Sequence, residues 1–336
     1  MDKQKTKVFL DKVSFTVPIV ESRRLKVKDN VFQLLNSEPN NQTVNRVDSD
    51  LYDISDCRVK HYPEINGRYN HNFHIDIHIR LNVKKGYSSK QGYSFKEAHI
   101  NIKVSIYPKN KSHNFIRFEF NPAKLGKVGG FKIQTLLIKI LGMKLARTVF
   151  YEARLTRLDT TIDCHSAVNK FYMYMKGFSC SEIIRGADDE IQSQICGSDQ
   201  SDIRVTAYDK AEQTKQLHGV DAESVSWVRL EIVNCDLGFS VAEIREKLEN
   251  QFKKLSFYRD DFLADTYFDD DFLVAAQADG LNAALSQLHI NDRKRYFRRL
   301  EHYAFDPFKL SRLTIKPGLE SLRFLRATKY VPRVAT

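Results

Sequence analysis

The chain has 336 residues, of which 42% are hydrophobic and 28% are charged, and its formal net charge is +11. This composition excludes a disordered chain, and no apolar run reaches the roughly 18 residues that a membrane-spanning helix needs. The N-terminus lacks the apolar segment of a secretory signal, and the five cysteines have no CxxC spacing, which favours reduced thiols over a zinc site. We therefore expect a cytoplasmic protein without a membrane partner.

The first part of the chain is expected to form an antiparallel sheet. Alternating polar and apolar residues predict strands over 8–20, 71–83, 98–107 and 114–121. A short helix is expected around 31–35 and a hairpin loop over 84–91. Gly129 and Gly130 are expected to break the chain before a helix over 133–140, whose apolar spacing suits packing on a sheet.

The second part of the chain has the same character. Strands are predicted over 153–164, 192–196, 202–210 and 226–234, and a helical stretch is expected over 166–176. Ser240, followed by Glu243 three residues later, is typical of a capping box, which predicts an amphipathic helix over 240–255. The remaining residues are expected to be mostly helical.

One order of motifs occurs twice. A strand ending in Tyr-x-Lys at Tyr107 precedes Arg117-x-Glu119, and the same arrangement at Tyr208 precedes Arg229-x-Glu231. We therefore predict an α+β fold in which two tandem, similar antiparallel-sheet units carry helices on one face, followed by a mostly helical basic C-terminal region. The predicted domains are an N-terminal half-repeat over 1–128, a catalytic half-repeat over 129–240 and a helical DNA-binding region over 241–336.

The two halves differ in their acidic residues. The strand that carries Asp159 and Asp163 corresponds to Lys12–Pro18 in the first half, where no acid shares that face. Carboxylates on neighbouring strands can supply oxygen ligands to Mg²⁺ or Mn²⁺, which bind through a few carboxylates and substrate phosphate. We therefore predict Asp159, Asp163 and Glu231 as metal ligands.

Tyr208 is the candidate nucleophile of this second half. A tyrosine can attack phosphorus and form a phosphotyrosyl bond, but its ordinary pKa of about 10 requires neighbours that favour the phenolate. Arg204, Lys210 and Arg229 are the candidate catalytic cations, because they can supply that bias and clamp a phosphate. The competing interpretation is a ladder of salt bridges on an exposed sheet face.

The C-terminal region carries much of the excess positive charge. Between residue 291 and the C-terminus there are twelve Lys and Arg against four Asp and Glu, with aromatic residues between them. A basic segment of this kind indicates a polyanionic partner, although charge runs are often only a solvated face. The predicted DNA-binding residues are Arg293, Lys294, Arg295, Arg298, Arg299, Arg312 and Lys316.

Four segments of this chain, found in one order, resemble the Rep_trans family of rolling-circle replication initiators of small staphylococcal plasmids, which has relatives in filamentous phages. The segments are Arg117–Leu125, Thr156–Asp159, Arg204–Lys210 and Trp227–Glu231, and the resemblance covers roughly residues 100–240. The N-terminal 90 residues and the C-terminal third do not resemble the family.

The resemblance implies a metal-dependent nicking-closing enzyme of a bacterial cell. Tyr208 matches the tyrosine that attacks one strand at the origin, remains on the 5′ phosphate and leaves a 3′ hydroxyl as primer, before religation at termination. Asp159 and Glu231 match family acids, and the C-terminal segment contributes origin recognition. The partners it implies are origin DNA, both double-stranded and nicked, a host replicative helicase and a second copy of the chain.

Several alternatives remain open. His74, Asp76 and His78 on one strand face are a second candidate metal site, and an ordinary polar face is the alternative. Tyr107 is a second candidate nucleophile that is expected to be structural, because it lacks the paired aspartates. A DNA-binding regulator without catalytic activity is the alternative function, and an RNA-binding module lacks the exposed aromatic pairs such sheets use.

Overall fold

The computed structural model describes residues 8–36, 57–63, 68–83, 94–110, 114–218, 226–313, 315 and 319–326. It contains two compact units, which are described here separately. The N-terminal unit comprises Leu10–Leu158, Asp236–Leu248 and Leu319–Thr336, and the C-terminal unit comprises Met1–Phe9, Asp159–Cys235 and Glu249–Gly318. The expected hairpin loop over 84–91 lies outside the described residues.

The N-terminal unit contains an antiparallel sheet with the strand order β2-β3-β4-β5-β1. Its strands are β1 (Phe9–Pro18), β2 (Cys57–Pro63), β3 (Tyr69–Val83), β4 (Ser94–Pro108) and β5 (Phe115–Phe120). Apolar side chains alternate with polar ones along β1 and β5, so that one face of the sheet is buried. Phe15 and Phe118 stack on that buried face with ring centroids 5.5 Å apart.

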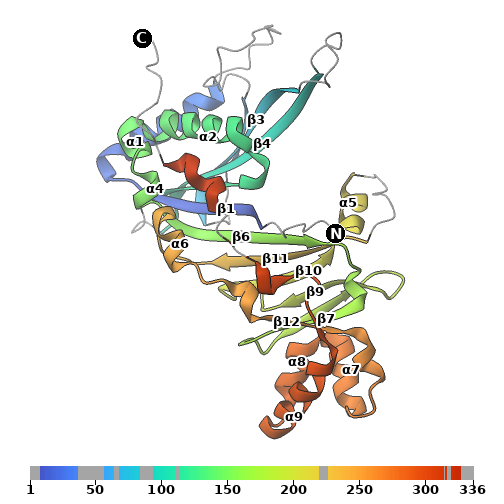
Figure 1. The fold of residues 1–336 in the computed structure, drawn as a ribbon. Helices are drawn as coiled ribbons and strands as arrows, with labels where there is room; N and C mark the ends of the chain where they lie inside the picture. The colour runs from blue at the N-terminus through green and yellow to red at the C-terminus, as the bar shows by residue number, and fades with distance from the viewer. Residues whose placement is uncertain are drawn as a thin grey trace. The chain divides into compact units, whose positions relative to one another are not determined.

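Helices cover the apolar face of this sheet (Figure 1). They are α1 (Glu21–Asn36), α2 (Gly126–Leu141), α3 (Met143–Ala146), α4 (Val149–Glu152) and α6 (Ile244–Lys247), with short 3-10 turns η1 (Pro122–Lys124), η3 (Val241–Glu243) and η8 (Glu320–Leu325). Val31 of α1 and the buried Leu136 and Ile140 of α2 contribute to the core. Asn30 also ties the two helices together by donating to the carbonyl of Ile140 at 2.9 Å.

Gly129 and Gly130 lie inside α2, so the prediction that they break the chain is wrong. A Cβ at Gly129 would lie 2.6 Å from Cδ1 of Ile100, and one at Gly130 would lie 3.1 Å from Cβ of Phe324. The missing side chain at both positions lets α2 pack closely against its neighbours, although glycine destabilises the interior of a helix.

The C-terminal unit contains two sheets. The larger has the order β6-β11-β10-β9-β8, in which residues 159–164 of β6 belong to this unit. The smaller has the order β13-β12-β7. The strands are β6 (Arg154–Cys164), β7 (Phe171–Met175), β8 (Ser181–Arg185), β9 (Ile191–Cys196), β10 (Ile203–Asp209), β11 (Val228–Cys235), β12 (Leu255–Arg259) and β13 (Ala304–Phe305).

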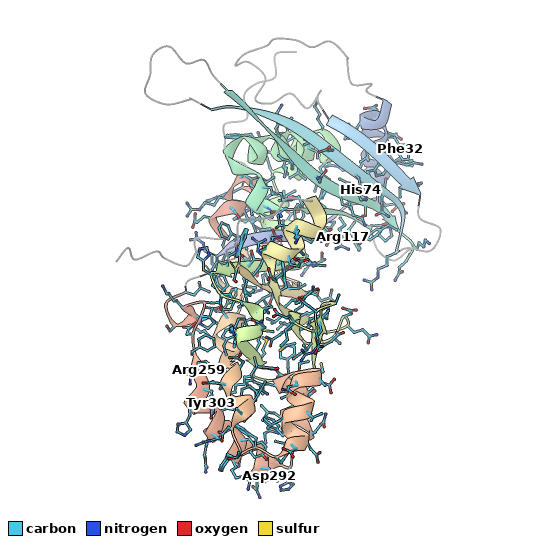
Figure 2. All side chains as sticks on the ribbon, turned by 90° about the vertical axis from the view of Figure 1, so that its right-hand side faces the viewer. Phe32, His74, Arg117, Arg259, Asp292 and Tyr303 are labelled. Carbon is cyan, nitrogen blue, oxygen red and sulfur yellow. The ribbon has the colours of Figure 1, made fainter. Side chains whose placement is uncertain are left out.

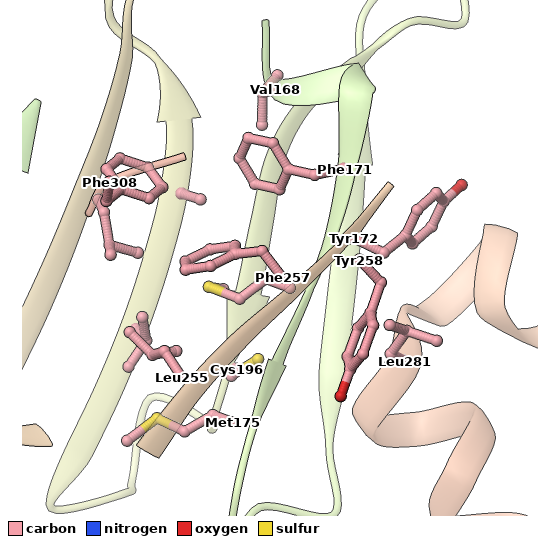
Figure 3. Packing of buried hydrophobic residues seen from close by; sticks show 14 of the residues in the cluster. Val168, Phe171, Tyr172, Met175, Cys196, Leu255, Phe257, Tyr258, Leu281 and Phe308 are labelled. Carbon is pink, nitrogen blue, oxygen red and sulfur yellow. The ribbon is translucent and has the colours of Figure 1, made fainter. Parts of the chain in front are cut away.

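The helices of the C-terminal unit are α5 (Lys210–His218), α7 (Asp270–Asp279), α8 (Leu281–Gln287) and α9 (Ile290–Leu300), with the 3-10 turns η2 (Val168–Lys170), η4 (Gln251–Lys254), η5 (Asp260–Ala264), η6 (Glu301–Tyr303) and η7 (Leu310–Arg312). One apolar core joins the smaller sheet to α7, α8 and α9. Figure 3 shows Phe171, Phe257 and Phe308 packed together in this core. Phe171 and Phe257 meet edge to face at 5.3 Å.

The predicted α+β class, with antiparallel-sheet units and a helical C-terminal region, is confirmed. The helix expected over 166–176 is wrong, because Phe171–Met175 forms β7, of which four residues are buried. The capping box at Ser240 and Glu243 is present, but the continuous helical run that follows it ends at Lys247, and the segment up to residue 255 contains only the separate 3-10 turn η4. Among the described residues, no helix combines the length and the apolar character needed to cross a membrane.

Candidate active site on the sheet of the C-terminal unit

Tyr208 lies on β10 between β11 and β9. In the antiparallel register it is opposite Arg229 on β11 and opposite Ser193 on β9, while Thr206 is opposite Glu231. Directly opposed residues point to the same side of a sheet. We call this side the Tyr208 face. The other side carries Val205, Ala207, Leu230 and Ile232, which are all buried in the core.

Arg229 joins the Tyr208 face to β6. Its Nε donates to Oδ1 of Asp163 at 2.7 Å, and its Nη2 donates to Oδ2 at 2.9 Å. This bidentate pair is mostly shielded from solvent, with side-chain exposures of 15% for Arg229 and 21% for Asp163. Charge-assisted bidentate pairs of this kind fix side-chain geometry. The pair therefore holds the guanidinium beside the strand that carries Tyr208.

Asp159, Thr161 and Asp163 alternate along β6 and share one face with Arg229. Asp159 and Thr161 are fully buried, while Glu231 on β11 is half-buried. Within the described part of the chain, the Oγ1 of Thr161 is buried and has no hydrogen-bond partner, whereas Thr160, on the opposite side of β6, donates to the carbonyl of Ile232 at 3.4 Å. Buried hydroxyls without partners are rare, and this one alternates with Asp159 and Asp163 on the Tyr208 face.

Lys210 begins α5 immediately after the strand that carries Tyr208. Its Nζ lies 5.8 Å from the centre of the Tyr208 ring and donates to Oε1 of Gln213 at 2.5 Å. Asp209 starts the helix by accepting from the backbone N–H of Glu212 at 3.0 Å. Because the chain changes from strand to helix at this point, the Lys210 ammonium lies next to the phenol of Tyr208.

Arg204 is on the Tyr208 face but is not brought close to Tyr208. It is four residues earlier on β10, a separation of about 13 Å along a strand, and it is opposite Val233. Its guanidinium forms an ion pair with Asp199 in the turn between β9 and β10. The structure therefore groups Lys210 and Arg229 around Tyr208, and groups Arg204 with the turn.

The three predicted metal ligands do not form a three-ligand set. Among the described residues, no group of three or more His, Cys, Asp or Glu side chains is arranged to hold a metal ion. Asp163 is committed to Arg229 through both carboxylate oxygens. The other two predicted ligands, Asp159 and Glu231, lie on this face near Thr161, whose hydroxyl has no hydrogen-bond partner among the described residues. Two carboxylates suit Mg²⁺ when phosphate and water complete its coordination.

The predicted DNA-binding residues of α9 have different surroundings. Arg299 donates twice to Asp265, at 2.6 and 3.2 Å, and Arg293 donates to the carbonyls of Ser286 and Leu288. Arg295 stacks over Tyr296 and pairs with Asp292. Lys294 and Arg298 are exposed and have no ion pair within the described part of the chain. The side chain of Arg312 and the whole of Lys316 lie outside what the structure describes.

The Arg299 interaction affects a neighbouring acid strongly. The hydrogen bond from Arg299, together with those from the Tyr267 backbone and the Tyr303 hydroxyl, lowers the pKa of Asp265 to about 2. Figure 2 marks Tyr303, which also stacks with Arg259 at 5.9 Å. Arg299 thus has a structural partner, whereas Lys294 and Arg298 keep their charges directed to solvent.

The second candidate metal site is on β3. His74 is exposed and Asp76 is half-buried, both on the polar side of the N-terminal sheet, while the side chain of His78 lies outside the described residues (Figure 2). Tyr107 belongs to β4, and its side chain is likewise not among those described. In the register of β4 and β5, Ser105 is the residue opposite Arg117. Tyr107 therefore does not occupy the register position of Tyr208, which spacing along the sequence alone had suggested.

No family model matches the chain, and no curated protein matches it. A solved structure described as a rolling circle replication initiator protein from Geobacillus stearothermophilus is similar to 69% of this chain and 75% of its own chain, with 14% sequence identity and a TM-score of 0.35.

Proposed function

We propose that this protein is a rolling-circle DNA replication initiator that nicks one strand of its origin with Tyr208. The observation that carries the proposal is the register of β10 and β11, in which Tyr208 is opposite an arginine that is itself fixed by Asp163. The four sequence segments that resemble rolling-circle initiators support the same reading, since Tyr208, Arg229, Asp159 and Glu231 belong to them.

The proposed reaction is a transesterification. The phenolic oxygen of Tyr208 bonds to the scissile phosphorus as the bond from phosphorus to the 3′ oxygen breaks. The phenol loses its proton, and the 3′ oxygen gains one to become the hydroxyl that primes synthesis. Attack by that hydroxyl on the 5′-phosphotyrosyl bond reverses the reaction and religates the strand.

The neighbouring cations have distinct roles in this proposal. Lys210, 5.8 Å from the ring, favours the phenolate over the phenol. Arg229 retains the geometry to contact a phosphate next to Tyr208, because Asp163 orients its guanidinium from the other side. Arg204 is too far along β10 to act on the same phosphate and is assigned to a flanking phosphate or to the turn.

Asp159 and Glu231 would hold Mg²⁺ or Mn²⁺ on this face. A metal held there would neutralise charge on the phosphoryl oxygens. Asp163 is assigned to positioning Arg229 rather than to metal binding, because both of its oxygens accept from the guanidinium. Lys294 and Arg298 are assigned to contacts with duplex phosphates at the origin, and a host helicase is expected to unwind the nicked duplex.

The test is a nicking assay on supercoiled plasmid that carries the protein's own origin, with Mg²⁺ or Mn²⁺. Tyr208→Phe removes only the hydroxyl, and we expect nicking to fall below detection while duplex binding is kept. Tyr174→Phe is the matched control, because that tyrosine packs edge to face against Phe297 in the core of the same unit. Nicking by Tyr208→Phe at the wild-type rate would rule out Tyr208 as the nucleophile, whereas origin binding without nicking by the wild-type protein would favour the DNA-binding regulator.

A further inference from the structure

The sheet of the N-terminal unit repeats the arrangement of the Tyr208 face without its nucleophile. On β1 and β5, Thr16 is opposite Arg117 and Ser14 is opposite Glu119. On β4, Ser105 is opposite Arg117 and Lys103 is opposite Glu119. These side chains and Lys12, two residues before Ser14, share the polar side of the sheet, which we call the Glu119 face.

Arg117 and Arg229 are equivalent residues of the two Arg-x-Glu strands, but they are neutralised differently. Arg229 uses Nε and Nη2 to bind Asp163. The β1 residue opposite Arg117 is Thr16, which carries no charge and donates to the carbonyl of Arg154. Both hydrogen bonds of Arg117 leave from Nη2, to Glu119 at 3.0 Å and to Ser14 at 3.2 Å, and within the described residues Nε has no partner.

Glu119 is the acid at the centre of this face, and its carboxylate has three interaction partners among the described residues. It accepts from Ser14 at 2.8 Å and pairs with Lys12 at 3.5 Å as well as with Arg117. Burial alone would raise its pKa, but the Ser14 hydrogen bond and the charges of Lys12, Arg117 and Lys103 lower it below the usual value. Glu119 therefore remains ionised beside three cations, of which Lys12 and Arg117 contact it directly.

The cations outnumber the acids around Glu119. Lys12, Arg117 and Lys103 lie on three adjacent strands, β1, β5 and β4, so that they span about 10 Å across the sheet. The exposed His74 is opposite Lys103 on β3, and Asp76, two residues further, is the next acid. A row of cations held by one central carboxylate favours a ligand that carries several separated negative charges.

We propose that the Glu119 face is a non-catalytic docking site for the phosphodiester backbone of a nucleic acid strand. This inference rests on the proposed function, because it takes DNA as the polyanion that the protein meets. Ser105 is opposite Arg117 at the position that Tyr208 has in the other sheet, and the residues of β1 on this face, Lys12, Ser14 and Thr16, include no acid to support a second catalytic centre. Cations such as Lys12, Lys103 and Arg117 contact phosphates rather than base edges, so the contact is expected to be independent of base sequence.

The test compares two double variants of the full chain in the Tyr208→Phe background, where DNA stays intact. Lys12→Gln with Lys103→Gln removes two cations from the Glu119 face. Lys139→Gln with Lys144→Gln is the matched control, because those exposed lysines belong to α2 and α3 of the same unit. The probes are fluorescent oligonucleotides of random sequence, one single-stranded and one duplex, titrated over a series of salt concentrations.

We expect the face variant to bind at least one probe about tenfold more weakly at low salt, with a slope of log affinity against log salt that is shallower by about 2. The control variant should keep the wild-type slope. The probe with the larger loss identifies whether the strand is single or paired. Equal affinity and equal slope for both variants with both probes would overturn the inference, and this outcome would not bear on nicking by Tyr208. Thermal unfolding of each variant shows that a loss of binding is not a loss of folding.

Discussion

Tyr208 and Arg229 lie directly opposite each other on the antiparallel strands β10 and β11. Opposed residues in such a pair have Cβ atoms only about 5 Å apart, so a phosphate that reaches the phenol also reaches the guanidinium. Asp163 binds Arg229 from the neighbouring strand and keeps it in place. The candidate site is thus made by three strands rather than by a loop.

The Arg229–Asp163 pair is expected to stabilise the C-terminal unit measurably. Arg229→Gln leaves a half-buried carboxylate without its partner, and we expect the free energy of unfolding to fall by about 1–3 kcal/mol. Denaturant titration measures this loss. Arg259→Gln is the control, because its pair with Asp261 is exposed at 48% and 56% and should contribute less than about 1 kcal/mol. Equal losses in the two variants would contradict the role assigned to the Arg229 pair.

The carboxylates Asp159 and Glu231 are expected to act in catalysis rather than in DNA binding. Asp159→Asn and Glu231→Gln keep the side-chain shape, so we expect nicking to fall at least a hundredfold while affinity for duplex DNA changes less than about threefold. Nicking assays and oligonucleotide titrations on the same preparations measure both. Parallel loss of nicking and binding would argue against a separate catalytic role for these two acids.

The sequence predicts the strands of the Tyr208 face well, because half-buried strands such as β10 and β11 alternate polar and apolar residues. The same reasoning misses β7, since a strand in which four of five residues are buried has no such alternation. It also predicts a metal ligand at Asp163. The carboxylate of Asp163 instead accepts from Arg229 on β11, which is more than sixty residues later in the chain. Only the order of the strands in the sheet brings these two residues together.

Asp265 is expected to make stability depend on pH in the acid range. Arg299 and the other donors depress its pKa from 3.8 to about 2, so its contribution is complete above about pH 4 and is lost as the pH falls through about 2. Asp265→Asn should therefore lower stability at neutral pH and flatten the acid limb between about pH 4 and 2. Guanidinium titrations at a series of pH values test this, with the exposed Asp261→Asn as control. An unchanged acid limb in Asp265→Asn would show that other groups carry it.

The basic residues of α9 are expected to separate into two classes. Lys294→Gln with Arg298→Gln should weaken duplex binding and reduce its salt dependence by about 2 in slope, with no loss of stability. Arg299→Gln should instead lower the unfolding midpoint, because it breaks the two hydrogen bonds to Asp265. Binding titrations and thermal unfolding of both variants distinguish these roles. The assignment fails if Lys294 and Arg298 can be neutralised without any change in affinity.

The most direct test of the central claim is to capture the covalent intermediate. Incubation with an oligonucleotide that contains the origin nick site, followed by denaturation, proteolysis and mass spectrometry, identifies the residue that carries the 5′ phosphate. We predict a single modified peptide, with the nucleotide attached to Tyr208, and none in Tyr208→Phe. An adduct on any other tyrosine, including Tyr107, or nicking without an adduct, would contradict the account.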